Sequence, residues 1–125
     1  MTAPRPHRAL RVHGELSRGV LAVTVLVSLA VLFAPGSDVP SAPPGVDTLV
    51  HLTLFLALAL AGRWAGIRAR PLAVLLVAYA GLSEVVQALS DLQRSGSVLD
   101  WAADVAGAAL GLLAWTRLER RVPVG

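Results

Sequence analysis

Four apolar runs separated by short polar segments place the strongest constraint on how this chain can fold. They cover residues 20–34, 48–61, 71–89 and 98–115. A helix needs roughly 20 residues to cross the hydrocarbon core of a bilayer, and each run reaches that length with its flanking residues. The sequence therefore predicts an all-α integral membrane bundle of four transmembrane helices. The helices are expected at about 17–35, 47–66, 71–91 and 98–117.

The composition agrees with this class and excludes several others. Of the 125 residues, 55% are hydrophobic and only 15% are charged, a balance that does not suit a water-exposed surface. Cysteine is absent, which excludes disulfides, thiolate metal sites and cysteine nucleophiles. All eleven basic residues are arginines, and they lie in short clusters between the apolar runs. With so few aromatic residues beside them, we expect no nucleic-acid partner.

The arginines predict the orientation of the bundle. Ten of the eleven precede the first run, lie between the second and third, or follow the fourth, and only Arg94 falls on the other side. The positive-inside rule makes the arginine-rich side cytoplasmic. We therefore expect a multi-pass protein of the plasma membrane with both termini in the cytoplasm. Its parts would be a basic N-terminal segment 1–18, a membrane domain 19–117 and a cytoplasmic tail 118–125.

A signal peptide is the competing interpretation of the first run. Residues 1–34 combine a basic front with an apolar stretch, and Ala34-Pro35-Gly36 weakly imitates a cleavage site. Because proline suits such a site poorly, we expect the first helix to be retained. Cleavage would leave three helices and place the new N-terminus outside.

Several polar residues lie where apolar ones would be expected. Each of the last three runs carries a pair on one helix face: Asp47 with His51, Glu84 with Gln87, and Asp100 with Asp104. Charges inside a bilayer cost about 2.5–3.5 kcal/mol each on the insertion scale and usually mark function or pairing. Most acids fall opposite the arginines, namely Asp38, Asp47, Glu84, Asp91, Asp100 and Asp104. We expect a polar cluster in the outer leaflet, open to the external side and shared by the last three helices.

Purely structural interpretations remain open for these residues. Asp47 and Asp100 could be N-caps, with carboxylates at the positive ends of helices. His51 could be a hydrogen-bond partner of Glu84 or Asp104, and Gln87 could bond another helix. Glu84 is the hardest to explain in this way, because it lies in mid-helix among Leu, Val and Ala. Gly107 and Gly111 are expected to allow close helix packing.

Together these residues resemble the VanZ-like family. The resemblance covers about residues 45–115, and the first helix matches only in position and hydropathy. The ordered set is Asp47-x-x-x-His51, Glu84-x-x-Gln87, Arg94 and Asp100-x-x-x-Asp104-x-x-Gly107-x-x-x-Gly111. Two departures are Thr48, where many members have lysine, and Asp104, where many have asparagine. The segment from Gln87 to Arg94 also lacks the glycine and proline that often accompany that arginine.

The resemblance implies a membrane protein associated with resistance to teicoplanin-type lipoglycopeptides, without an agreed mechanism. The cluster would bind a lipid headgroup, a cell-wall precursor, the antibiotic or a partner protein, and Arg94 could meet a phosphate bidentately or serve as an interfacial anchor. The partners expected are membrane lipids and a lipid-linked cell-wall precursor or glycopeptide, and a homo-oligomer is left open. We expect no cofactor and assign no metal site.

Two other functions compete with binding. An intramembrane enzyme acting on a lipid-linked substrate could use His51 as a general base and Glu84 as an acid, or hold a divalent metal on His51 and carboxylates. The chain has no strong catalytic signature to support it. A small proton-coupled exporter is the third class, although the first helix lacks the acid that known small multidrug exporters carry there. A structural or assembly role also stays open.

Overall fold

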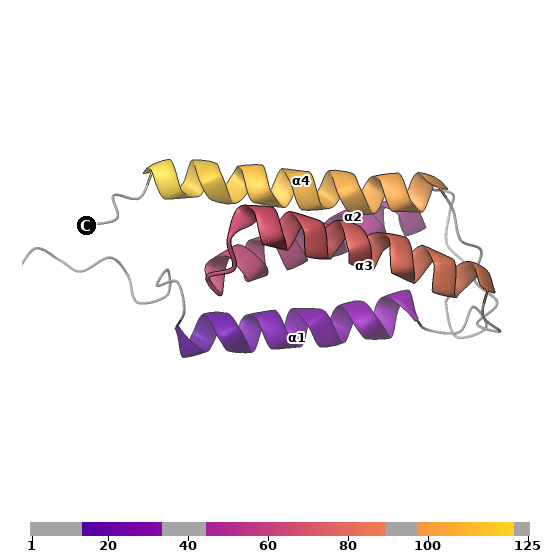
Figure 1. The fold of residues 1–125 in the computed structure, drawn as a ribbon, viewed down its shortest axis with the longest axis horizontal. Helices are drawn as coiled ribbons and strands as arrows, with labels where there is room; N and C mark the ends of the chain where they lie inside the picture. Colours follow the sequence, from indigo (N-terminus) through magenta and orange to yellow (C-terminus); the bar gives the residue numbers. More distant parts are fainter. Residues whose placement is uncertain (1–13, 34–44, 90–97, 122–125) are drawn as a thin grey trace, which may run out of the picture.

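The described part of the chain forms four antiparallel helices. The computed structural model describes residues 14–33, 45–89 and 98–121. The helices are α1 (Glu15–Leu32), α2 (Val46–Trp64), α3 (Ala69–Leu89) and α4 (Val98–Arg121). Successive helices run in opposite directions, and α1 and α4 lie on opposite sides of the bundle (Figure 1). The bundle therefore has one end where α2 and α4 begin and another where they finish.

All four helices are long and apolar enough to cross a membrane. Large hydrophobic side chains point away from the bundle on every helix, including Leu26, Leu49, Leu82 and Leu113. A soluble protein would bury this apolar surface, whereas a bilayer accommodates it. The predicted set of four apolar helices is confirmed, and it indicates a multi-pass membrane protein.

The closest packing joins α2 to α4. A Cβ atom at Gly107 would collide with the backbone carbonyl of Leu52, and one at Gly111 would lie 2.7 Å from the carbonyl oxygen of Leu56. Only glycine allows the two backbones to approach this closely. This approach brings the polar side chains at the start of α4 against those at the start of α2.

A small apolar core holds the other helices to this pair. It includes Leu32 of α1, Phe55 and Leu58 of α2, Leu76 of α3 and Ala108 of α4. Apart from Leu32 at the end of α1, these residues lie beyond the first turns of α2 and α4. The polar cluster at those first turns is therefore separated from the opposite end of the bundle by packed apolar side chains.

The observed helix bounds differ from the expected ones in two informative places. Helix α3 begins at Ala69 rather than at 71, because proline is tolerated throughout a first turn, where its missing N–H is not needed. Helix α4 continues to Arg121 rather than ending at 117, so the expected tail is helical over its first four residues. The apolar run ends at 115, and in the polar last turns of the helix the Glu119 carboxylate accepts a hydrogen bond from Trp115 Nε1 at 2.7 Å. Parts of the expected segments lie outside the described residues. They are 1–13 of the basic N-terminal segment, 34–35 of the first expected helix, 90–91 of the third and 122–125 of the tail.

Candidate functional site

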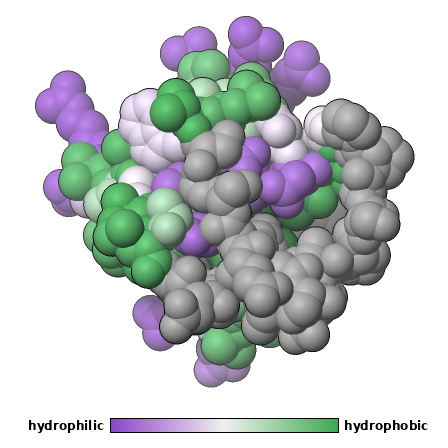
Figure 2. Space-filling view, turned by 90° about the vertical axis from the view of Figure 1, so that its right-hand side faces the viewer, coloured by the Kyte–Doolittle hydropathy of each residue, from purple (hydrophilic) through white to green (hydrophobic). Residues whose placement is uncertain are grey.

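The candidate site lies at the end of the bundle where α2 and α4 begin and α1 and α3 finish. Hydrophilic atoms lie in the middle of this end, among hydrophobic residues (Figure 2). The predicted residues here are Asp47 and His51 on α2, Glu84 and Gln87 on α3, and Asp100 and Asp104 on α4. The arrangement follows from helix spacing, because each pair three or four residues apart presents one face to the bundle.

His51 is at the centre of the cluster. Its side chain is only 1% exposed, and its Nδ1 lies 2.8 Å from Oδ1 of Asp104, which is fully buried. An ionised carboxylate can only accept, so with Asp104 ionised the imidazole donates this hydrogen bond through Nδ1–H. The bond joins α2 to α4 at the level where glycine brings the two helices together.

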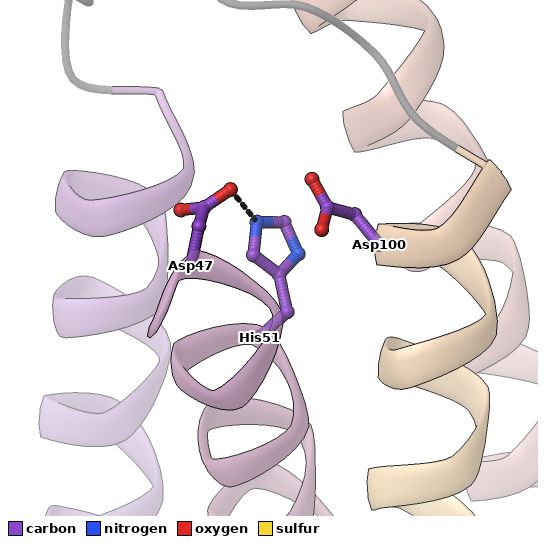
Figure 3. Close-up of side chains that lie close together, drawn as sticks. All are labelled: Asp47, His51 and Asp100. Atoms are coloured by element: carbon purple, nitrogen blue, oxygen red, sulfur yellow. Dashed lines mark ion pairs between the residues drawn. The ribbon is translucent and has the colours of Figure 1, made fainter. Parts of the chain in front are cut away.

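Three further carboxyl groups surround this pair. Glu84 Oε1 lies 3.7 Å from His51 Nδ1, and Asp47 Oδ2 lies 3.8 Å from His51 Nε2. The carboxyl groups of Asp47 and Asp100 flank the ring, one on α2 and the other at the start of α4 (Figure 3). The Thr48 hydroxyl donates a hydrogen bond of 3.3 Å to Asp100. Four acids from three helices thus converge on one imidazole.

The cluster contains buried atoms whose bonding capacity no hydrogen bond uses. Within the described residues, His51 Nε2 and Asp104 Oδ2 are buried and have no hydrogen-bond partner. Such atoms are costly in an apolar setting, and each one calls for an explanation, such as a bound ion or water. The cluster also contains two groups of three side chains spaced to hold a metal ion: Asp47, His51 and Asp100, and His51, Glu84 and Asp104. Its described charged groups are mostly acidic, which favours a cation or the cationic part of a ligand.

Gln87 is engaged by the backbone of a neighbouring helix. The Gln87 amide donates a hydrogen bond of 2.5 Å to the backbone carbonyl of Leu32, at the last residue of α1. This bond satisfies one of the free carbonyls at a helix end and attaches α3 to α1. Arg94, with Asp38 and Asp91, lies outside the described residues.

The N-cap interpretation of Asp47 is wrong. Gly45 occupies the N-cap position of α2, with φ 91°, and no side chain caps that end. Asp47 instead lies in the first turn, where its carboxylate still interacts favourably with the helix dipole. Asp100 likewise lies in the first turn of α4 and faces His51 and Thr48.

Other polar contacts were not anticipated from the sequence. The Thr48 hydroxyl of α2 bonds Asp100 of α4, which residue spacing did not predict. Ser28 of α1 hydrogen-bonds the Tyr79 hydroxyl of α3 at 2.8 Å. A lone serine and a lone tyrosine in apolar helices were the available signals. The Ser28–Tyr79 bond attaches α1 to α3 and adds a polar contact to the apolar packing of α1.

Comparison with family models, with curated proteins and with solved structures found no match to this chain. The resemblance to the VanZ-like family stays a prediction based on the residues quoted above.

Proposed function

We propose that this protein is a VanZ-like protein of the plasma membrane that binds an envelope ligand at its outer end. The arginine-rich end would face the cytoplasm, and the His51 cluster would lie in the outer leaflet. The ligand would be a lipid headgroup, a cell-wall precursor or a teicoplanin-type glycopeptide. Its binding would modulate the envelope and protect the cell from such antibiotics.

The observation that carries this proposal is the convergence of four acids and His51 at one end of a bundle of membrane-length helices. Acids in such helices are expensive and are retained mainly where they pair or act. Asp47, with its side chain 56% exposed, gives the cluster an accessible edge. The described carboxylates would recognise an ammonium group of the ligand through charge-assisted hydrogen bonds.

Replacement of Glu84 by Gln tests this proposal. Loss of one charged contact should weaken ligand binding roughly 10- to 100-fold, since such a hydrogen bond contributes about 1.5–3 kcal/mol. The variant should also lose protection in a teicoplanin susceptibility assay. Binding would be measured by screening lipids, cell-wall precursors and teicoplanin against detergent-purified protein. Glu119→Gln, which removes an acid at the opposite end, is the matched control and should behave as wild type.

Two results would contradict the proposal. One is unchanged binding and susceptibility in Glu84→Gln at equal membrane abundance. The other is an equal loss in Glu119→Gln, which would trace the effect to folding or expression rather than to the cluster.

The bond between His51 and Asp104 favours a second candidate function, an intramembrane enzyme. An imidazole oriented by a carboxylate is a common general base. On this reading the protein would cleave a lipid-linked substrate at the outer leaflet. Incubating purified protein with a lipid-linked cell-wall precursor and following release of its headgroup tests this. Release that persists in His51→Gln would eliminate His51 as the base.

A further inference from the structure

We propose that this end of the bundle binds a divalent transition-metal ion through His51 Nε2 and the carboxylates of Asp47 and Asp100. One potential ligand atom from each of these residues lies within 4.8 Å of the other two. Figure 3 shows the two carboxyl groups beside the ring, one carried by α2 and the other by α4. A metal here would link the first turns of the two most closely packed helices.

The hydrogen bond from Nδ1 to Asp104 prepares the ring for this role. Because Nδ1 carries the proton donated to Asp104, the lone pair of a neutral ring lies on Nε2. Metal-binding histidines characteristically donate their other ring N–H to a carboxylate in this way. Asp104 is therefore a positioning residue in the proposal and not a ligand.

The surroundings of Nε2 supply the second observation. This atom belongs to a side chain that is 1% exposed, and it has no hydrogen-bond partner within the described residues. Its contact with Asp47 Oδ2 is the 3.8 Å ion pair drawn in Figure 3, which is too long for a hydrogen bond. Nitrogen and oxygen ligands bind zinc at about 2.0–2.2 Å, which puts two ligands of one ion roughly 3–3.5 Å apart. Small side-chain movements would bring the three ligands to that spacing.

The identity of the donors points to the class of ion. One imidazole and two carboxylates suit zinc and similar transition metals better than magnesium or calcium, which favour oxygen ligands alone. Three protein ligands leave a coordination position for water or for an anionic group, such as a phosphate. Such a metal would let an acidic cluster receive an anionic ligand. The inference rests on the proposed function only in placing this end at the outer aqueous surface.

The alternative set of His51, Glu84 and Asp104 satisfies the same distance criterion. It fits less well because Asp104 already holds Nδ1 through the 2.8 Å hydrogen bond. It also lacks Asp47, the accessible edge of the cluster. The two sets share only His51: the carboxylates come from Asp47 and Asp100 in one and from Glu84 and Asp104 in the other, and substitution of Asp100 and of Glu84 distinguishes them.

Zinc binding by the full chain tests the proposal. Untagged protein would be purified in detergent with His7→Ala and His13→Ala introduced, because these histidines near the N-terminus could bind zinc independently. Titration calorimetry and elemental analysis should find one zinc per chain. Asp47→Asn, Asp100→Asn and His51→Ala should each weaken binding by at least about tenfold, as loss of a metal ligand does. Asp104→Asn should weaken it about 10- to 100-fold, as loss of a carboxylate behind a histidine ligand does.

The controls separate metal binding from folding and from the proposed function. Glu119→Gln should bind zinc as the parent does. Asp47→Asn alters a largely exposed side chain, so it remains informative if His51→Ala fails to fold. Absence of zinc binding, or equal zinc binding in all the cluster variants, overturns the proposal. A larger loss of zinc affinity in Glu84→Gln than in Asp100→Asn overturns the choice of ligands. Zinc binding alongside wild-type susceptibility of Glu84→Gln cells would remove the proposed function and leave the metal site standing.

Discussion

Each end of this bundle holds a basic residue close to an acid, but the two pairs lie in different environments. At one end, His51 and Asp104 are 1% and 0% exposed and are 2.8 Å apart. At the other, Arg63 and Glu119 are 19% and 41% exposed and are 3.5 Å apart. The first pair is enclosed by helices and further acids, while the second lies at the last turns of α2 and α4.

The difference in burial between the two pairs implies a difference in their roles. An ion pair near a surface is solvated, so its partners need no precise geometry and contribute little to stability. A buried pair has lost its hydration, so each partner depends on the other and on nearby hydrogen bonds. In the proposed orientation the arginine-rich end acts through the number of its charges, whereas the His51 end acts through the arrangement of its side chains.

The sharpest comparison of the two ends removes the basic partner from each pair. His51→Ala leaves Asp104 buried without its donor and should lower the free energy of unfolding by about 3–5 kcal/mol. Arg63→Ala loses a partly exposed ion pair and a hydrogen bond to the Ile67 carbonyl, and should lower it by about 1–2 kcal/mol. Unfolding by SDS in mixed micelles, followed by circular dichroism, measures both. Equal losses would show that burial does not distinguish the ends.

An intermediate effect is expected where glycine allows α2 and α4 to approach. Gly107→Ala adds a Cβ against the carbonyl of Leu52, and the helices must separate to accommodate it. Overpacking of this kind costs typically about 1–3 kcal/mol. Gly19→Ala on α1, where a Cβ meets nothing within 4 Å, is the matched control and should not destabilise the fold. The same titration measures both variants, and a harmless Gly107→Ala would mean that the helices can adjust without cost.

The smallest effect is expected from Glu119→Gln. The amide oxygen can still accept the hydrogen bond from Trp115 Nε1, so the change removes only the ionic part of the contact with Arg63. Stability should change by less than about 1 kcal/mol. Added salt should also have less effect on the variant than on wild type, because screening weakens exposed pairs. A loss comparable to that of His51→Ala would show that this end is as tightly constrained as the other.

Part of the candidate site could be predicted from the spacing of polar residues along the sequence. Asp47 with His51, and Asp100 with Asp104, are four residues apart, so each pair must share a helix face. The arginine clusters and apolar runs likewise placed these pairs at the same end. Spacing could not reveal that Thr48 bonds Asp100 or that Gln87 bonds the carbonyl of Leu32, because these contacts join residues more than 50 positions apart.

The sequence by itself determined four apolar helices, their alternating direction and the concentration of arginine at one end. These properties depend on local hydropathy and on the length of a membrane span, which the order of residues specifies directly. Only the tertiary structure decided which acid pairs with His51, because that choice depends on the rotation and separation of α2 and α4. Glycine at 107 and 111 allows the close approach, and the approach puts Asp104 at Nδ1 and leaves the ring between Asp47 and Asp100, with Nε2 toward Asp47.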